Sequence, residues 1–467
     1  MLNEFRILCP TGHLSYTRLE KDSLALGLKR QPNAICADAG SCDPGPFPLG
    51  ANEAASPTEW QYYDLEQMLL AARQLNVPMV VGSANDCGTN QGVDKFVEMI
   101  GRIAAENGLA PFRLASIRHS LDKSHLVSAL RQNTRVEGLG GFADLTLQDI
   151  QSTTNLVPVM GAEPIVRALE KGADVVITSR TSDCCVFAGP AIFAGCTRDV
   201  AYFAGKLLEC ASFCAEPYMA KESVLGTLEE DAVRVEPMHP QQRCTPASVA
   251  GHAMYEREDP RYEEVAGGCI DMTGCSYEQF DDSTTRVRGA RFRPSSQYRV
   301  KLEGAGKVGE RCYVVAGMRD PDNIRRLDDA LAWAKRMIDQ QFSIGDDYQV
   351  HYHVYGRNGV MGPLEVVKQI TSHELGIVVE AIAPTLNEAE TLVKLAARSL
   401  FYARIETKGT AGGAAYLTED VLTGKSVYRW TMNHLITLPD PYSLFPITLE
   451  TISGFADPGC QETARPT

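Results

Sequence analysis

Three short apolar runs, rich in β-branched residues, each lead directly into a loop of Gly, Ser, Thr and Asp. The runs cover residues 33–37, 77–81 and 173–177, and the loops cover residues 38–46, 82–88 and 178–183. Such runs are typical of strands buried on both faces of a parallel sheet. Because open α/β sheets bind ligands beyond the carboxyl ends of their strands, the three loops predict one shared site. The alternative is that the loops only shape turns and cap helices.

Helical and strand patterns alternate in the first part of the chain. Apolar residues recur at helical spacing in residues 64–76, 92–107, 122–132 and 161–171, and residues 112–117 form a further apolar run. Alternating strands and helices predict a parallel sheet covered by helices on both faces. A second helix-rich stretch spans residues 197–214.

From about residue 224 the pattern changes to short alternating segments that favour antiparallel strands. Strand patterns cover residues 267–272, 285–290, 298–303, 313–319, 348–355, 376–382 and 427–438, and helical patterns cover 323–341 and 386–403. We therefore expect an α/β protein with a parallel sheet and flanking helices in its N-terminal half and a mixed α/β second domain. The predicted domains are residues 1–223 and 224–455, followed by a disordered tail at 456–467.

Composition supports a globular protein of more than one domain. The 467 residues exceed an ordinary single domain, and 44% are hydrophobic and 22% charged. No apolar run reaches 18 residues, and the first residues lack the pattern of a signal peptide, so we expect a cytoplasmic protein with no membrane span. The net charge of −14 argues against nucleic acid or an anionic membrane as the main partner.

The fourteen cysteines do not have zinc-site spacing, because no CxxC pair occurs. Cys36, Cys42 and Cys87 lie in or beside the predicted site loops. We expect reduced thiols that fill the core, with a catalytic cysteine as the alternative. The chain also lacks the GxSxG, GxxxxGK[ST] and HExxH motifs and a dinucleotide fingerprint. This absence argues against a common hydrolase, kinase or metalloprotease, and no NAD or nucleotide motif is present.

The strand-end loops supply most of the candidate site residues. The candidates for substrate binding there are Asp38, Gly40, Ser41, Ser83, Asp86 and Arg180, and the candidates for catalysis are Asp43 and Asp183. Asp38 and Asp43 could share a divalent cation such as Mg²⁺, or one could act as a base with a raised pKa. A turn role is equally open. Arg180 could hold a substrate carboxylate or phosphate, or form an internal ion pair with Asp183 or Glu209.

Further candidates lie in the second half. His252, Tyr255 and Glu256 fall in one possible helical turn, where His252 and Glu256 could serve in acid–base catalysis. The alternative for His252 is a hydrogen-bonded structural role. Arg319, at a strand end, and Arg357 are candidates for binding a substrate anion.

Two pairs of residues in predicted strands each share one strand face. Lys301 and Glu303 could pair structurally or present a cation to an anionic ligand. His351 and His353 could be zinc ligands, although no third ligand is near in sequence.

Several segments of the chain resemble the acyclic terpene utilisation family. The matching stretches are residues 37–46, 161–165, 172–183, 205–210, 243–246, 252–256, 300–305, 355–360 and 444–446. The resemblance runs from about residue 35 to residue 452. It implies pathways that handle acyl-CoA thioesters and branched or unsaturated acids, and it implies a small companion subunit. The chain departs from the family pattern at residues 83–88 and 408–413.

The leading hypothesis is a lyase, hydratase or isomerase that acts on a small carboxylic acid or its acyl-CoA thioester. An arginine would hold a carboxylate, and Asp43, Asp183, His252 or Glu256 would move the proton α to a carbonyl. The second hypothesis is a non-catalytic ligand-binding or scaffold subunit that works with the small companion protein. The third is an amide or ester hydrolase with Ser41, Ser83 or a cysteine as nucleophile. We also expect an oligomer.

Overall fold

The computed structural model describes residues 4–40, 44–219, 221–257, 259–403, 416–418 and 420–454. Five features of the sequence predictions lie outside these ranges. They are the candidates Ser41 and Asp43, Cys42 of the same loop, the segment 408–413, and the predicted tail 456–467.

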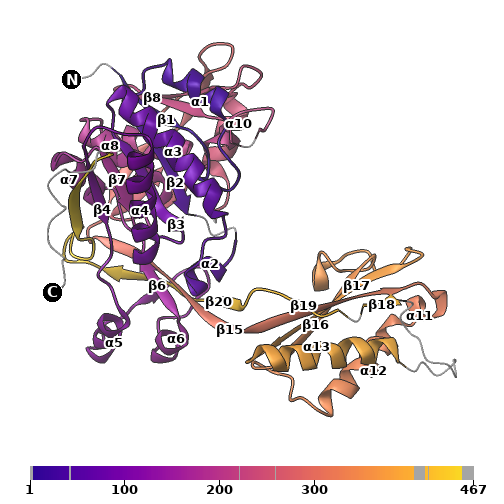
Figure 1. Ribbon diagram of the computed structural model, residues 1–467. Coiled ribbons are helices and arrows are strands. Elements are labelled where there is room, and N and C mark those ends of the chain that lie inside the picture. The colour runs from indigo at the N-terminus through magenta and orange to yellow at the C-terminus, as the bar shows by residue number, and fades with distance from the viewer. Residues whose placement is uncertain are drawn as a thin grey trace, which may run out of the picture. The chain divides into compact units, whose positions relative to one another are not determined.

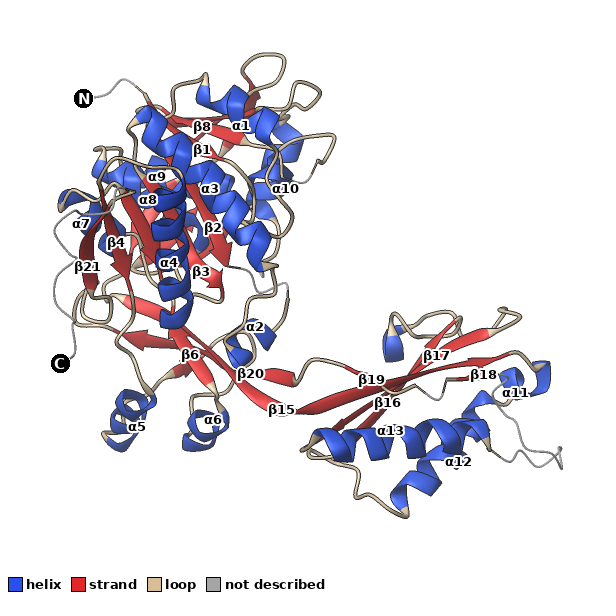
Figure 2. Ribbon diagram, viewed as in Figure 1, coloured by secondary structure: helices blue, strands red, loops and turns tan. Residues whose placement is uncertain are grey.

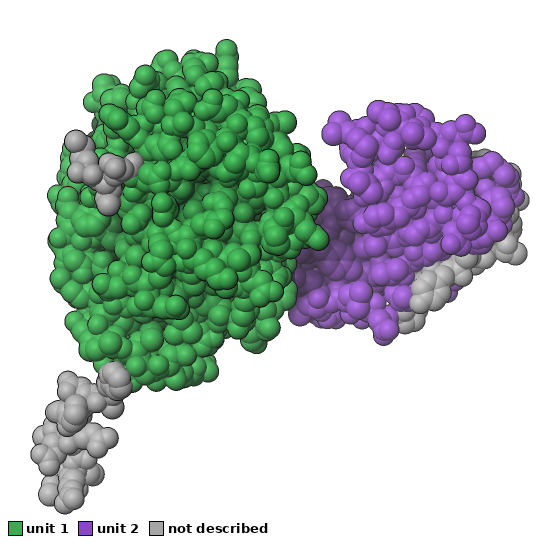
Figure 3. Space-filling model, turned by 90° about the horizontal axis from the view of Figure 1, so that it is seen from above, with its two compact units in different colours: residues 1–305, 430–467 green, residues 306–429 purple. Residues whose placement is uncertain are grey.

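The chain forms two compact units, which Figure 3 colours separately. The first contains residues 1–305 and 430–467, and the second contains residues 306–429. Strand β15 (Arg299–Met318) contributes to both units, since it pairs with β6 (Asn155–Pro158) in the first and with β17 (Leu375–Ala383) in the second.

The first unit is built on a sheet whose centre is parallel (Figures 1 and 2). Its parallel strands lie in the order β1 (Phe5–Cys9), β2 (Ala34–Gly40), β3 (Met79–Asp86), β7 (Val175–Thr178) and β4 (Phe112–Ile117). β2, β3, β7 and β4 contain the apolar runs of the sequence, and nearly all their residues are buried. β2 and β3 are longer than predicted, since they continue through residues 38–40 and 82–86, which were expected to be loop. The prediction of an α/β fold with a parallel sheet is therefore confirmed.

Antiparallel strands extend this sheet at both edges. Beside β1 lie β8 (Val224–Leu228), β9 (Ala232–Pro237), β13 (Thr285–Arg288) and β12 (Ser276–Gln279). Beside β4 lies β21 (Ile447–Ile452), the last strand described in the chain. The domain boundary expected after residue 223 does not separate the units, because β8 follows it directly and pairs with β1 along its whole length.

Helices cover both faces of the sheet. One face packs against α1 (Lys21–Leu28), α3 (Thr58–Leu75) and α4 (Asn90–Glu106), and the other against α7 (Glu163–Glu170), α8 (Asp183–Phe193), α9 (Arg198–Leu208) and α10 (Pro246–Met254). Almost every residue of α8 is buried because this helix lies between the sheet and α9. Gly205 permits the close approach of α9, since a Cβ there would lie 2.1 Å from the carbonyl oxygen of Cys184.

The remaining elements of the first unit are short. They are α2 (Phe47–Ala51), α5 (Lys123–Arg131), α6 (Leu147–Ser152), the 3₁₀ turn η1 (Ala211–Cys214), β5 (Glu137–Gly138), β10 (Tyr262–Val265), β11 (Gly268–Asp271), β14 (Arg291–Pro294) and β20 (Val427–Thr437). The last of these strands begins in the second unit. The helix-rich stretch predicted for residues 197–214 is divided, because Cys210 has a left-handed backbone that separates α9 from η1.

The second unit places two helices against an antiparallel sheet. Its sheet contains β16 (Gln349–Tyr355), β17 and part of β15, with the short strands β18 (Tyr416–Leu417) and β19 (Leu422–Thr423) paired to β15. Its helical elements are α11 (Pro321–Arg325), α12 (Leu327–Asp339), α13 (Leu386–Phe401) and the 3₁₀ turn η2 (Gly362–Leu364). The mixed α/β character expected of the second half is confirmed. Among the helices that the structure describes, none is both long and apolar enough to cross a membrane.

Candidate functional site

A cavity of about 850 Å³ opens beyond the carboxyl ends of the parallel strands in the first unit. Gly12 and His13 follow β1, Gly40 ends β2, and Arg180 and Asp183 follow β7. The segment between α9 and β10 contributes many of the other lining residues. The cavity therefore occupies the position at which open α/β sheets bind ligands.

Arg180 is the best-connected cation of this cavity. Its Nη1 donates to Asp183 Oδ1 at 2.7 Å and to Ser83 Oγ at 3.0 Å, and its Nε donates to Glu303 Oε2 at 3.1 Å. Nη2 makes no hydrogen bond to any described residue, so it is the donor available to an anionic ligand. Although burial acts to raise the pKa of Glu303, Arg180 and Lys301 together hold it at about 2.

Two glycines allow the loops to meet at Arg180. Gly88 has a left-handed backbone with φ +64°, and a Cβ there would lie 2.2 Å from the backbone nitrogen of Arg180. A Cβ on Gly40 would lie 2.4 Å from the Cβ of Ser83 and 3.1 Å from Nη1 of Arg180. Larger side chains at either position would force the strand-end loops apart.

On the other side of the cavity, Lys221 lies against His13. The Lys221 ammonium donates to the backbone oxygen of His13 and lies 5.7 Å from the centre of the Tyr16 ring. Only 4% of Lys221 is exposed, and this burial lowers its pKa to about 8. A lysine that titrates near neutral pH can donate or accept a proton under physiological conditions.

His13 is held in one tautomer by its surroundings. Its Nε2 lies 3.2 Å from the carbonyl oxygen of Ala39, which can only accept, so Nε2 carries the proton. Nδ1 is then a free acceptor with no hydrogen bond to a described residue. Burial, and then the charge of Lys221, lower the pKa of His13, so the imidazole is neutral at pH 7. Asp86 Oδ1 lies 3.9 Å from Nε2.

Lys206, Glu209, Arg257 and Glu263 form a second buried charge network in the cavity wall. Lys206 donates to Glu209 and lies 3.5 Å from Glu263, which also pairs with Arg257 at 2.5 Å. Burial, and then the charge of Glu263, raise the pKa of Glu209 well above its usual range. The network can therefore hold a proton in the interior.

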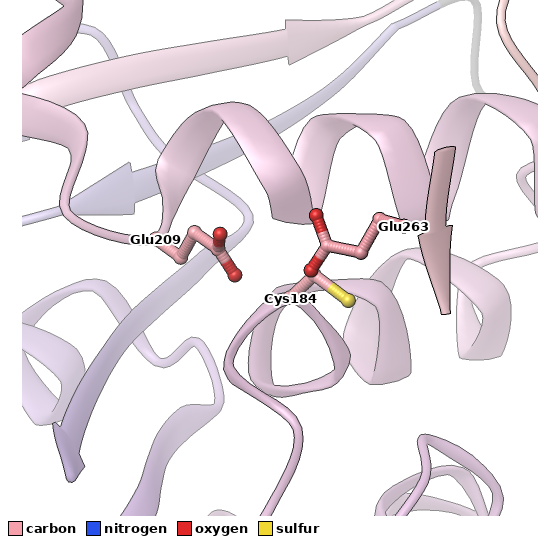
Figure 4. A group of neighbouring side chains, drawn as sticks. All are labelled: Cys184, Glu209 and Glu263. Atoms are coloured by element: carbon pink, nitrogen blue, oxygen red, sulfur yellow. The ribbon is translucent and has the colours of Figure 1, made fainter. Parts of the chain in front are cut away.

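Cys184, Glu209 and Glu263 lie close together (Figure 4), with ligand atoms within 4.8 Å of one another. They are the only group of metal-ligating type among the described residues. Lys206 and Arg257 already pair with the two carboxylates, and the pKa of the Cys184 thiol is raised, first by its hydrogen bond to Cys185. A neutral thiol and carboxylates already paired with a cation are a poor set of metal ligands.

Aromatic rings line part of the cavity. The rings of Phe213 and Tyr218 stack with centroids 4.9 Å apart and are 48% and 56% exposed, and Tyr16 stacks on His13 at 5.5 Å. Exposed, mutually stacked rings offer flat apolar surface to the chain of a bound substrate.

A family model described as "Acyclic terpene utilisation family protein AtuA" matches residues 7–432. The chain belongs to this family. The match contains every residue described so far in the cavity. A comparison with curated proteins found no match, and a comparison with solved structures also found none.

In this AtuA family member, the predicted strand-end residues Asp38, Ser83 and Asp86 are all buried. Asp38 Oδ2 accepts from the Gly40 backbone at 3.0 Å, while Oδ1 makes no hydrogen bond to a described residue. Burial, and then Asp183, raise the pKa of Asp38 well above its usual range. Ser83 Oγ donates to the carbonyl oxygen of Thr181 and accepts from Arg180, and no hydrogen bond joins it to a histidine of the described chain.

The predicted turn at 252–256 is not one helical turn. Helix α10 ends at Met254, and Glu256 has a left-handed backbone, so His252 and Glu256 do not share a helix face. His252 Nε2 lies 2.9 Å from the carbonyl oxygen of Glu209, and burial lowers the pKa of His252 to about 3. Tyr255 and Glu256 line the cavity, but His252 does not.

The remaining candidates belong to the second unit. Arg319 is exposed, and Arg357 forms a two-bonded ion pair with Asp328 at 2.7 and 3.0 Å. His353 Nε2 lies 2.8 Å from Glu380, and the rings of His351 and His353 are 6.3 Å apart. No metal-ligating group among the described residues contains either histidine.

Sequence reasoning missed His13, Lys206 and Lys221. His13 follows the first strand closely, so the rule that identified the other strand ends applies to it as well. Lys206 and Lys221 do not directly follow a predicted parallel strand. They reach the cavity from a helix and a loop far along the chain, so this rule could not identify them.

Proposed function

We propose that the chain is an enzyme of the lyase, hydratase or isomerase type that acts on a small carboxylic acid or its acyl-CoA thioester. The reaction takes place in the strand-end cavity of the first unit. The observation that carries this proposal is the buried Lys221, whose ammonium donates to the backbone oxygen of His13 and whose pKa burial lowers to about 8. The substrate class comes from the family resemblance.

In this proposal His13 Nδ1 takes the proton α to the carbonyl. The electron pair of the broken C–H bond moves onto the carbonyl oxygen and forms an enolate. The Lys221 ammonium stabilises that negative charge, or protonates the oxygen, because it keeps donors beyond the one given to His13. Isomerisation ends when the proton returns to another carbon, and dehydration ends when a β-hydroxyl leaves with a proton.

Arg180 positions the substrate. Nη2 would donate to a carboxylate or to the thioester oxygen, while Asp183, Ser83 and Glu303 keep the guanidinium in place. The aromatic rings of Phe213 and Tyr218 would contact the acyl chain.

A divalent cation such as Mg²⁺ was expected at Asp38 and Asp43. Asp43 lies outside the described residues, and the pKa of Asp38 is raised by burial, which favours the neutral acid over a metal-binding carboxylate. We therefore assign no step to a metal.

The test is a thermal-shift screen of butanoate, succinate, citrate and acetyl-CoA, with and without Mg²⁺. A ligand at 100 times its dissociation constant adds about 2.7 kcal/mol of stability. We expect one class to stabilise the protein and the effect to disappear in Arg180→Lys, which keeps the charge but loses the planar fork. Arg357→Lys in the second unit is the matched control. If no compound stabilises the wild type, the proposal fails and a scaffold subunit is favoured.

A second candidate function, binding of a small companion subunit, is supported by the surface of the second unit. Val360, Leu364, Val366 and Val367 are between 62% and 87% exposed within eight residues of chain. Contiguous exposed apolar side chains are typical of protein interaction sites. Leu364→Asp with Val366→Asp should abolish binding of the companion and leave ligand binding in the first unit unchanged, as measured by co-purification and thermal shift.

A further inference from the structure

The loop between β1 and α1, residues 10–20, lines part of the strand-end cavity. His13, Tyr16 and Thr17 of this loop are lining residues, and the ring of Tyr16 stacks on that of His13 with centroids 5.5 Å apart. Because the loop carries the proposed base, the proposed reaction depends on how the loop is held.

One buried carboxylate of α3 holds this loop at two points. Asp64 is fully buried, and its Oδ2 accepts from the backbone N–H of Ser15 at 2.8 Å while its Oδ1 accepts from that of Leu19 at 2.9 Å. Hydrogen bonds to an ionised carboxylate are roughly twice as strong as those between neutral groups. Ser15 has a left-handed backbone with φ +68°, a conformation that persists in a residue other than glycine only when its surroundings fix it.

Lys221 holds the same loop through two further hydrogen bonds. Its ammonium donates to the backbone oxygen of His13, and its own backbone oxygen accepts from the N–H of Glu20 at 3.3 Å. The contacts made by Lys221, at residues 13 and 20, thus flank those made by Asp64, at residues 15 and 19. The segment that carries Tyr16 is fixed between them.

Asp64 and Lys221 also act on each other through their charges. Burial raises the pKa of Asp64 to about 6, which leaves the carboxylate ionised at pH 7. Lys221 lowers the pKa of Asp64, and Asp64 raises the pKa of Lys221, although burial outweighs both effects. The anion of Asp64 therefore favours the charged form of Lys221.

Other groups act more weakly on this pair. The charge of Arg18 lowers the pKa of Asp64, and the charge of Asp86 raises that of Lys221. Two thiols near Lys221 are neutral at pH 7 because burial raises their pKa, and they belong to Cys9 and Cys210.

We propose that Asp64 is a positioning residue for the proton transfer proposed above. Its carboxylate holds the loop so that His13 and Tyr16 line the cavity, and its charge keeps Lys221 protonated at neutral pH. Asp64 does not itself line the cavity, so it acts through these residues. The inference rests on the proposed function for the reaction that it serves, whereas the loop contacts and the effect on Lys221 can be measured without turnover.

Asp64→Asn tests the charge. This variant removes the anion, so the pKa of Lys221 should fall further below its usual value. Urea unfolding then gives the readout, because the rise of stability with pH that begins near pH 8 in the wild type should begin about one unit lower. Glu59→Gln, which removes an exposed carboxylate at the start of the same helix, should leave the onset near pH 8.

Exchange of the α-protons of butanoyl-CoA in D₂O tests the effect on the reaction. Asp64→Asn should lower kcat at least ten-fold and change KM less than three-fold, because Arg180 and the aromatic rings keep their contacts. The alkaline fall of kcat/KM should also begin about one unit lower than in the wild type. If the wild type catalyses no exchange, the proposed function fails, while the unfolding measurement still tests Asp64.

Hydrogen exchange of the wild type, followed by mass spectrometry, keeps the proposal testable if Asp64→Asn fails to fold. Protonation of Asp64 below about pH 6 replaces one acceptor by a hydroxyl, so protection of Ser15 or Leu19 should fall about ten-fold between pH 7 and pH 5. Unchanged protection would overturn the proposal. A loss of rate in Asp64→Asn without either pH shift would show a merely structural role and would also overturn it.

Discussion

At the scale of single residues, the strand-end cavity is a set of buried charges with fixed partners. Arg180 is held between Asp183 and Glu303, while Lys221 is buried with its ammonium on a backbone oxygen. A buried ion pair is expensive to break, because the partner that is left behind keeps its charge without compensation. Arg180 and Lys221 should therefore affect stability in opposite directions when they are replaced.

Arg180→Met should lower the free energy of unfolding by up to about 3 kcal/mol, because Glu303 stays buried with only the more exposed Lys301 as its cation. Adding Glu303→Leu should recover part of that loss. Urea unfolding of the single and double variants measures both values. If the single variant is as stable as the wild type, the ion pair does not hold the loops together.

Lys221→Met should increase the free energy of unfolding at pH 7 by up to about 3 kcal/mol. The folded pKa of about 8 lies below the usual 10.5, so the unfolded chain binds more protons between these values. Wild-type stability should therefore rise with pH from about 8 to 10.5, and that rise should be absent in Lys221→Met. Lys171→Met is the exposed control. Urea unfolding across this pH range measures the free energy of unfolding of each variant. The same pH dependence in Lys221→Met and Lys171→Met would contradict the account.

At the scale of elements, the cavity depends on how closely the strand-end loops approach one another. The sequence predicted the strands, because buried parallel strands give continuous apolar runs. It began two of the loops too early, since β2 continues to Gly40 and β3 to Asp86. The sequence prediction was wrong at the end of α10. Residues 252–256 were expected to form one helical turn, but the helix ends at Met254. The prediction also missed β21, a short edge strand whose exposed Glu450 and Thr451 weaken the apolar signal.

Gly88→Ala tests the loop contact directly. We expect it to destabilise the protein by more than 2 kcal/mol and to weaken ligand binding, because its Cβ would overlap the backbone of Arg180. Gly108→Ala is the matched control, since Gly108 is also left-handed, with φ +56°, but has open space around it. It should cost only about 1 kcal/mol. Equal losses in the two variants would show that backbone strain alone explains the effect.

At the scale of the whole molecule, the first unit is assembled from distant parts of the chain. His13 follows the first strand, Arg180 follows β7, and Lys206 and Lys221 come from later segments. β20 begins in the second unit and leads back into the first, where β21 follows it, and no local sequence pattern predicts this return. The sequence therefore predicted the layers and one edge of the site, whereas the opposing wall depends on tertiary contacts that sequence periodicity does not report.

The acid–base assignment predicts how activity depends on pH. Neutral His13 must accept a proton and charged Lys221 must stabilise the enolate, so kcat/KM should fall as the pH rises through about 8. Lys221→Arg keeps its positive charge at high pH, so the fall in kcat/KM should begin at a higher pH in this variant. If kcat/KM falls at the same pH in Lys221→Arg as in the wild type, the titration of another group causes the fall.

The most direct test of the proposed proton transfer is exchange of the α-protons of butanoyl-CoA and of butanoate in D₂O, followed by proton NMR. This measurement requires no knowledge of the complete reaction. The account predicts exchange catalysed by the wild type and by Lys171→Met, and a loss of roughly 100-fold or more in His13→Gln and in Lys221→Met. Absence of exchange with both compounds, or equal rates in the wild type and in these two site variants, would contradict it.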